Sequence, residues 1–271
     1  MGHTRLGKVP KTQKWTAVVS LIAGSDASGG GGGGGVLLAD DIQAVSQQTL
    51  DAAQEGLKKA IDDLGLRYTF YLLTQLVLAA RTEDWVSDLD ALGIQLTEDA
   101  TVFDLTSELQ NAIDVYIETY AFPTDVSEIA QQAAGEAISE LAGTEQIALF
   151  SSSREELQRA IRGLSTKKGF SKLGQIFFGR FMSRFLNFYL SRITAANSDS
   201  DRLKQIGDIS RFNDSLRRHC EQSAQIVHDF CGQWYSKTEF EKGIDLSNTS
   251  GFMAVAIRKL QDELMQQGGE L

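Results

Sequence analysis

KKGFSKLGQIFFGRFMSRFLNFYLSR, residues Lys167–Arg192, is the stretch of the sequence that decides the fold. At 100° per residue, its phenylalanines and other apolar side chains cover well over half of the helical circumference. The remaining polar side chains form one strip with spacings of three and four: Arg180, Ser183, Arg184, Asn187 and Ser191. A helix that is apolar over most of its surface belongs inside a helical bundle. The segment therefore predicts an all-α protein built around a central aromatic-rich helix.

The rest of the chain also favours helices, because it has only two prolines and long segments rich in Ala, Leu, Gln and Glu. We expect an irregular bundle of about seven to nine helices. The tyrosines of the segments 67–81 and 102–120 fall among apolar residues, and this pattern places Tyr68, Tyr71, Tyr116 and Tyr120 in the core, together with Phe103. The segments with helical periodicity are 13–23, 39–64, 67–81, 85–92, 102–120, 124–142, 153–164, 167–193, 201–235 and 250–267.

Composition divides the chain into three parts. Residues 1–28 hold a basic arm and a short helix, whose apolar face includes Trp15 and needs a partner. Seven consecutive glycines, residues 29–35, follow as a flexible tether, because they offer no side chains to pack. Residues 36–271 form the helical domain, with a further subdivision expected near 143–153. Gly65 is expected to end the helix that precedes it.

Charge is segregated along the sequence. No Lys or Arg lies between Arg81 and Arg154, although this segment holds 15 acidic residues. From Leu157 to Ser198 there are eight Lys and Arg residues and no acidic one. The two blocks either pack side by side and neutralise each other, or form two partner-facing surfaces of opposite sign. The net charge of -10 argues against a general nucleic-acid binder.

The sequence predicts a cytoplasmic protein with no transmembrane span. The most apolar segment, residues 68–80, has 13 uncharged residues, whereas a membrane-spanning helix needs about 20. Two cysteines in 271 residues give no disulfide framework and suit a reducing compartment.

Cysteine and histidine come close together only near the segment 219–231. Cys220 and Cys231 fall on one helical face, and His228 lies one turn before Cys231, while His219 points to the far side. A closed zinc site needs four ligands, and a Cys/His nucleophile needs a third residue and oxyanion donors. Core cysteines are the favoured interpretation, so we expect no metal, no cofactor and no catalytic residues; a metal or a Cys/His enzyme site is the alternative.

The candidate anion- or partner-binding residues lie in the basic block: Lys167, Lys168, Lys172, Arg180 and Arg184. Two guanidinium groups one turn apart on a mostly buried helix need anionic partners. One interpretation pairs Arg180 and Arg184 with carboxylates of the same chain. The other makes them a site for a phosphate backbone or for the acidic patch of another subunit.

A second candidate partner-binding set comprises Trp234, Tyr235 and Lys237, together with Trp15 near the N-terminus; the corner at 234–237 is expected to be either packed or partner-binding. The segments GHTRLG (residues 2–7) and WYSKT (residues 234–238) loosely resemble those of bacterial proteins from phage-defence or mobile-element loci. This resemblance implies a bacterial source and a role in antiviral defence, but no fold or activity.

The absence of a catalytic constellation and the segregated charges favour a non-enzymatic subunit or adaptor of a cytoplasmic multiprotein assembly. Other protein subunits are the expected partners, and a homo-oligomer is also compatible with the sequence. One alternative is a nucleic-acid-associated module, in which the basic arm and Lys167–Arg192 contact phosphates and exposed rings stack on bases. Another alternative is an unrecognised enzyme with a Cys/His site.

Overall fold

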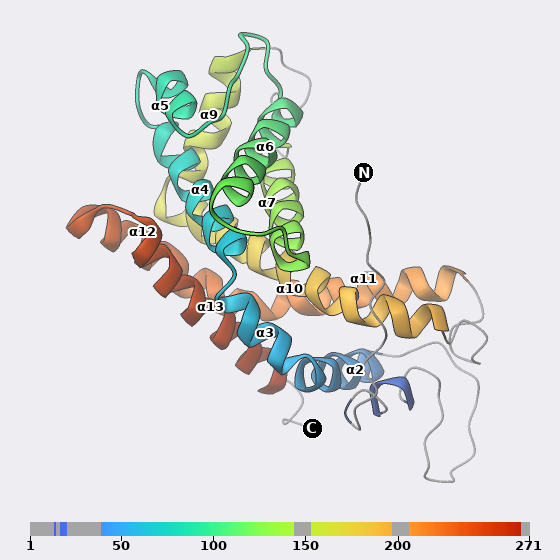
Figure 1. The fold of residues 1–271 in the computed structure, drawn as a ribbon. Helices are drawn as coiled ribbons and strands as arrows, with labels where there is room; N and C mark the ends of the chain where they lie inside the picture. Colours follow the sequence, from blue (N-terminus) through green and yellow to red (C-terminus); the bar gives the residue numbers. More distant parts are fainter. Residues whose placement is uncertain (1–13, 15–16, 21–38, 144–152, 197–205, 267–271) are drawn as a thin grey trace.

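The computed structural model is all-helical, as predicted, and it describes residues 14, 17–20, 39–143, 153–196 and 206–266, with no strand among them. Eleven helices lie in the described residues from Ala39 onward, and residues 14 and 17–20 are also helical, so the expected count of seven to nine is not confirmed. The helices (Figure 1) are α2 (Ala39–Ala52), α3 (Gln54–Ile61), α4 (Leu64–Ala79), α5 (Trp85–Ala91), α6 (Val102–Tyr120), α7 (Asp125–Gly143), α9 (Arg154–Leu164), α10 (Lys167–Ala196), α11 (Ile206–Ser223), α12 (Gln225–Lys242) and α13 (Leu246–Gln266).

Two predicted long helices are each divided in the structure, which raises the number of elements. The segment 39–64 is interrupted at Ala53, and the segment 201–235 is interrupted at Ala224. Neither alanine provides a side-chain cap. Because Ala is the best helix former, nothing at these two positions signals a break.

Gly65 does not end a helix, contrary to the prediction; it lies in the first turn of α4. That turn is capped by Asp63, whose carboxylate accepts a hydrogen bond from the backbone N–H of Leu66 at 2.8 Å. A Cβ atom at Gly65 would collide with Ser127 of α7. The glycine is thus explained by the close approach of two helices rather than by a turn.

The helices form two groups joined by α10. In the view of Figure 1, α4, α5, α6, α7 and α9 lie in the upper part, and α2, α3, α11, α12 and α13 lie in the lower part. Helix α10 contacts α7 and α9 in the first group and α2, α11 and α12 in the second. It is accordingly among the most buried elements of the described chain.

Aromatic rings from three helices meet in the core. The ring of Phe70 in α4 has its centroid 5.2 Å from that of Phe177 and 5.1 Å from that of Phe178, both in α10. On its other side it stacks on Phe252 of α13 at 5.6 Å. All four rings are buried, so this cluster connects the two groups of helices.

Helices α10 and α12 approach closely at two glycines. A Cβ atom on Gly174 of α10 would collide with Sγ of Cys231, and one on Gly232 of α12 would collide with the carbonyl oxygen of Lys167. Small residues at both points let the two backbones come together.

The described part of the N-terminal segment is helical and rests on α2. Val18 is buried, and Lys14 Nζ lies 2.7 Å from Asp51 Oδ1. Trp15, the glycine tether at 29–35 and most of the predicted boundary at 143–153 lie outside the described residues. Within the described residues, none of the helices combines the length and the hydropathy required to span a bilayer.

Candidate functional site

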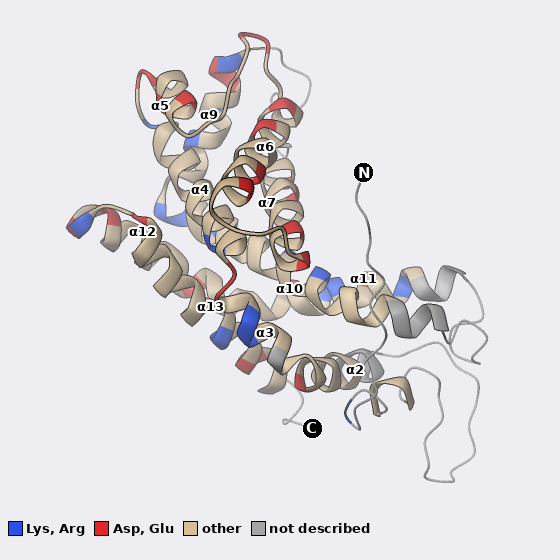
Figure 2. Ribbon diagram, in the orientation of Figure 1, with Lys and Arg blue, Asp and Glu red and all other residues tan. Residues whose placement is uncertain are grey.

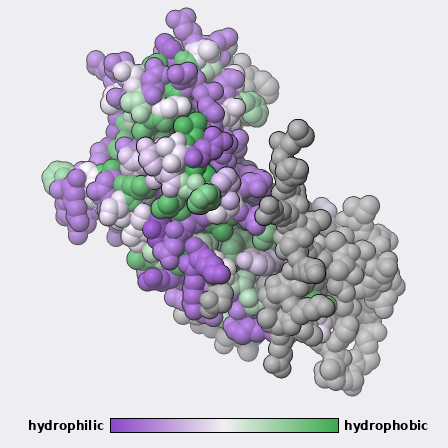
Figure 3. All heavy atoms as spheres, in the orientation of Figure 1, coloured by the Kyte–Doolittle hydropathy of each residue, from purple (hydrophilic) through white to green (hydrophobic). Residues whose placement is uncertain are grey.

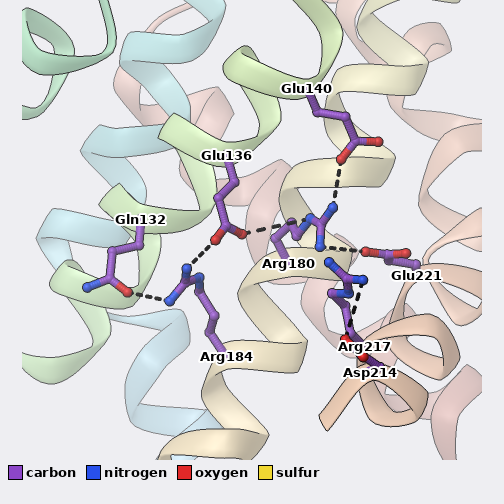
Figure 4. A network of polar contacts seen from close by, with 8 residues as sticks. All are labelled: Gln132, Glu136, Glu140, Arg180, Arg184, Asp214, Arg217 and Glu221. Atoms are coloured by element: carbon purple, nitrogen blue, oxygen red, sulfur yellow. Dashed lines mark hydrogen bonds and ion pairs between the residues drawn. The ribbon is translucent and has the colours of Figure 1, made fainter. Parts of the chain in front are cut away.

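Arg180 and Arg184 of α10 lie in a network of polar contacts with two neighbouring helices (Figure 4). Arg180, whose side chain is 15% exposed, places Nη2 2.7 Å from Glu140 Oε2, Nη1 2.9 Å from Glu221 Oε1 and Nε 3.8 Å from Glu136 Oε2. Arg184 pairs with Glu136 and donates a hydrogen bond to the side chain of Gln132. The network joins α10 to α7 and α11.

Helical spacing explains why these side chains meet. Gln132, Glu136 and Glu140 follow one another at intervals of four and therefore lie on one face of α7. Arg180 and Arg184 have the same interval on α10, so the two rows pack side by side. Glu221 of α11 completes the set from the other side of Arg180.

The carboxylates compensate the charge of Arg180 in its partly buried position. Burial opposes the charged form, but the hydrogen bond to Glu140 and the charges of Glu221 and Glu136 together raise the pKa of Arg180. The structure thus agrees with the first interpretation of these arginines, in which they pair with carboxylates of the same chain.

A cleft of about 510 Å³ lies along this network between α7, α10 and α11. Its lining includes three arginines, Arg180, Arg184 and Arg217. It also includes more carboxylates than arginines: Asp125, Glu128, Glu136 and Asp214. Because the carboxylates outnumber the arginines, the cleft offers no excess of positive charge. An external anion would have to displace a carboxylate from its arginine. It provides polar surface but no arrangement of a nucleophile, a base and an oxyanion hole.

The five predicted anion-binding residues do not form one site. Lys167, Lys168 and Lys172 are exposed in the first turns of α10. Arg180 lies eight residues beyond Lys172, about 12 Å along the helix axis. The rings between them, including that of Phe177, are buried. The rings nearest these lysines are therefore not available for stacking on bases, and of the rings in α10 only Phe188 and Tyr189 are partly exposed.

Of the second partner-binding set, Lys237 alone is exposed among the three residues that the structure describes. Trp234 is partly buried and stacks on Phe252 with a centroid distance of 4.2 Å. Tyr235 is fully buried, stacks on Phe170 at 4.0 Å and lies below the guanidinium of Arg81. Burial raises the pKa of Tyr235. The ring of Tyr235 thus belongs to the core, which agrees with the packed alternative for this corner.

The cysteines are buried and not in a disulfide. Burial raises the pKa of Cys220 and of Cys231, which suppresses the nucleophilic thiolate form. Burial also lowers the pKa of His219. His228 Nδ1 lies 3.6 Å from Asp229 Oδ1, on the same helix. In the part of the chain that the structure describes, no group of three or more His, Cys, Asp or Glu residues has the geometry of a metal site.

Sequence reasoning missed a surface of tyrosines on α4 and α6. The rings of Tyr71, Tyr68, Tyr116 and Tyr120 follow one another in space, and we call this set the tyrosine ladder. Tyr120 is 68% exposed, so its assignment to the core was wrong, whereas Tyr68, Tyr71 and Tyr116 are partly buried and Tyr68 packs against the core. Phe103, also assigned to the core, is 62% exposed. The available signal was the residue type, since Tyr suits a position with one apolar and one wet end.

No family model, no curated protein and no solved structure matches this chain.

Proposed function

We propose that this protein is a non-enzymatic helical adaptor that binds another protein through the surface of α4 and α6. The observation that supports the proposal is the exposure of large rings on an acidic element. Tyr120 and Phe122 are 68% and 87% exposed, and Phe103 is exposed on the same helix. Tyrosine and other aromatic residues are enriched where proteins bind proteins.

The charge of this surface favours a protein partner over nucleic acid. Figure 2 shows acidic residues on α6 and α7 and no basic residue on either helix. A phosphate backbone would be repelled there. The exposed lysines at the start of α10 lie next to buried rings, those of Phe170, Phe177 and Phe178, so these aromatic and basic groups do not combine into a surface for single strands.

The assembly that we propose is cytoplasmic and bacterial. The compartment is supported by the two cysteines, which are buried and not joined in a disulfide. The bacterial source rests on the resemblance of residues 2–7 and 234–238, and a role in phage defence is part of the same proposal.

The test is the size and composition of the native species. Tagged protein expressed at its natural level is purified gently, and its mass is measured by light scattering after size exclusion. We expect a species larger than the 29.7 kDa of one chain, with a second protein identified by mass spectrometry. A 29.7 kDa monomer with no co-purifying protein would contradict the proposal.

A further inference from the structure

The tyrosine ladder is a continuous run of rings contributed by two helices. The centroids of Tyr71 and Tyr68 in α4 are 6.0 Å apart. Tyr68 stacks on Tyr116 of α6 with a centroid distance of 3.6 Å and an interplanar angle of 3°. Tyr116 in turn lies 5.0 Å from Tyr120. The ladder thus crosses from one helix to the other along the surface.

The ladder lies on a face with further exposed apolar groups. Leu64, one turn before Tyr68, is exposed at the start of α4, and Phe122 follows the end of α6. Figure 3 shows hydrophobic and intermediate residues exposed over α4 and α6 between strongly hydrophilic ones. Aromatic anchors with a polar rim are the composition of a protein–protein interface.

The electrostatic environment of the ladder is negative. Helix α6 carries Asp104, Glu108, Asp114 and Glu118, and no Lys or Arg occurs in residues 82–153. At the other end of the ladder, burial and the charge of Asp245 raise the pKa of Tyr71. The nearest cation in sequence, Arg67, is held elsewhere, because its Nε donates to the carbonyl of Ile61 and its Nη2 pairs with Asp62.

Neutral tyrosine rings near carboxylates are complementary to cationic side chains. The face of an aromatic ring attracts guanidinium and ammonium groups, and nearby carboxylates add to this attraction. We propose that the tyrosine ladder is the docking surface for a protein segment that presents arginine or lysine side chains. This inference rests on the adaptor function proposed above and specifies the chemistry of the partner.

A different protein, rather than a second copy of this chain, is the proposed occupant. The net charge of -10 makes two copies repel each other. In addition, Arg180 and Arg184 are already paired within the chain. The partner therefore supplies the positive charge that this surface lacks.

The first test uses defined probes on the full chain with carbon-13-labelled tyrosine. A 15-residue peptide of alternating arginine and alanine is titrated, and a glutamate–alanine peptide of equal length is the control. We expect the arginine peptide to shift the resonances of the four ladder tyrosines and to leave that of the buried Tyr235 in place. The glutamate peptide should shift none of them. Shifts confined to other tyrosines, or equal shifts with both peptides, would overturn the proposal.

Three variants of the most exposed ladder residue separate a ring-face contact from plain apolar contact. We expect Tyr120→Ala and Tyr120→Leu to weaken binding of the arginine peptide about two- to fivefold, which is the size of an exposed cation–π contact. Tyr120→Trp should retain or strengthen binding, because Trp has the best ring for cations. Phe240→Ala is the matched control, since it removes one fully exposed ring from α12 and should leave the affinity unchanged. Equal affinities of the Leu and Trp variants would contradict the proposal.

A second measurement distinguishes this inference from the proposed function. If the native complex persists in Tyr120→Ala and in a Tyr116→Ala/Tyr120→Ala double variant, the adaptor function stands and the ladder is not its docking surface. If no protein co-purifies with the wild type, the adaptor function fails, and the peptide titration alone decides which side chains the ladder binds. A wild-type dimer that Tyr120→Ala dissociates would replace the proposed partner by a second copy.

Discussion

Helices α10 and α6 carry charge of opposite sign and differ in where they place their rings. In α10 every phenylalanine except the partly buried Phe188 is buried, and Arg180 and Arg184 pair with carboxylates of α7 and α11. In α6 the rings of Phe103 and Tyr120 are exposed, on a helix without a basic residue. Helix α10 thus has more rings and buries most of them, whereas α6 has fewer rings and exposes two.

The difference shows that charge segregation along a sequence does not reveal which block faces solvent. The polar strip of α10 is narrow and surrounded by neighbouring helices, so its charges find partners inside the molecule. Among the described helices, α6 contacts mainly α4 and α7, and Phe103, Val115 and Tyr120 of this helix are exposed. The number of neighbouring helices, which is a tertiary property, decides the role of each block.

Replacing one phenylalanine in each helix gives the largest expected contrast. Phe177→Ala in α10 leaves a cavity in the aromatic cluster and should lower the free energy of unfolding by about 3–5 kcal/mol. Phe103→Ala in α6 removes a ring that is already in water and should change it by no more than about 0.5 kcal/mol. Urea unfolding followed by circular dichroism measures both values. Similar losses in the two variants would mean that α6 is covered in solution.

The charged residues provide a second, smaller contrast. Arg180→Ala leaves Glu140 and Glu221 without their cation and should cost about 2–3 kcal/mol, less than for a fully buried pair because both carboxylates are partly exposed. Lys172→Ala, on the same helix but at the surface, should cost less than about 0.5 kcal/mol. The same unfolding experiment at low and high salt checks both. If Arg180→Ala were as stable as Lys172→Ala, the network would be a surface feature rather than a link between three helices.

Local signals predicted much of the helical framework correctly. Val102 and Tyr120 were the predicted ends of α6, whose first turn is fixed by the capping box of Thr101 and Asp104. Ser153 caps α9 as expected, because its side chain accepts a hydrogen bond from the N–H of Glu156. The errors arose where tertiary contacts override such signals. Glycine is a residue type that often ends a helix, but Gly65 instead allows α4 and α7 to pack closely.

The site was less predictable, because its members come from separate helices. The spacing of Arg180 and Arg184 predicted their need for anions, and the sequence did not identify Glu136, Glu140 and Glu221 as the groups that supply them. Likewise, Tyr68 and Tyr116 stack only because α4 and α6 pack together. Helical periodicity assigns a residue to a face of its own helix, and it does not state whether another helix covers that face.

The smallest expected effect is the contribution of His219 to the pH dependence of folding stability. His219 lies on α11, which packs on α10, and its Nε2 is buried without a hydrogen-bond partner in the described structure. Burial lowers the pKa of His219 below the ordinary value of 6.5. The unfolded chain therefore binds a proton more readily than the folded chain, and stability falls as the pH falls through and below 6.5.

The variant His219→Gln isolates this contribution, because glutamine stays neutral over the whole range while every other titrating group is shared. Thermal unfolding at pH 7.5 and pH 5.5 should show a larger decrease in Tm for the wild type than for His219→Gln. Parallel decreases would mean that His219 is hydrated in the folded state. Helix α6 contains no histidine, and hydrogen bonds from Thr101 lower the pKa of Asp104 in its first turn. Acidification to pH 5.5 should therefore lower the local stability of α11, which carries His219, and leave that of α6 unchanged. Hydrogen exchange of the backbone amides in α11 and α6 measures this difference directly.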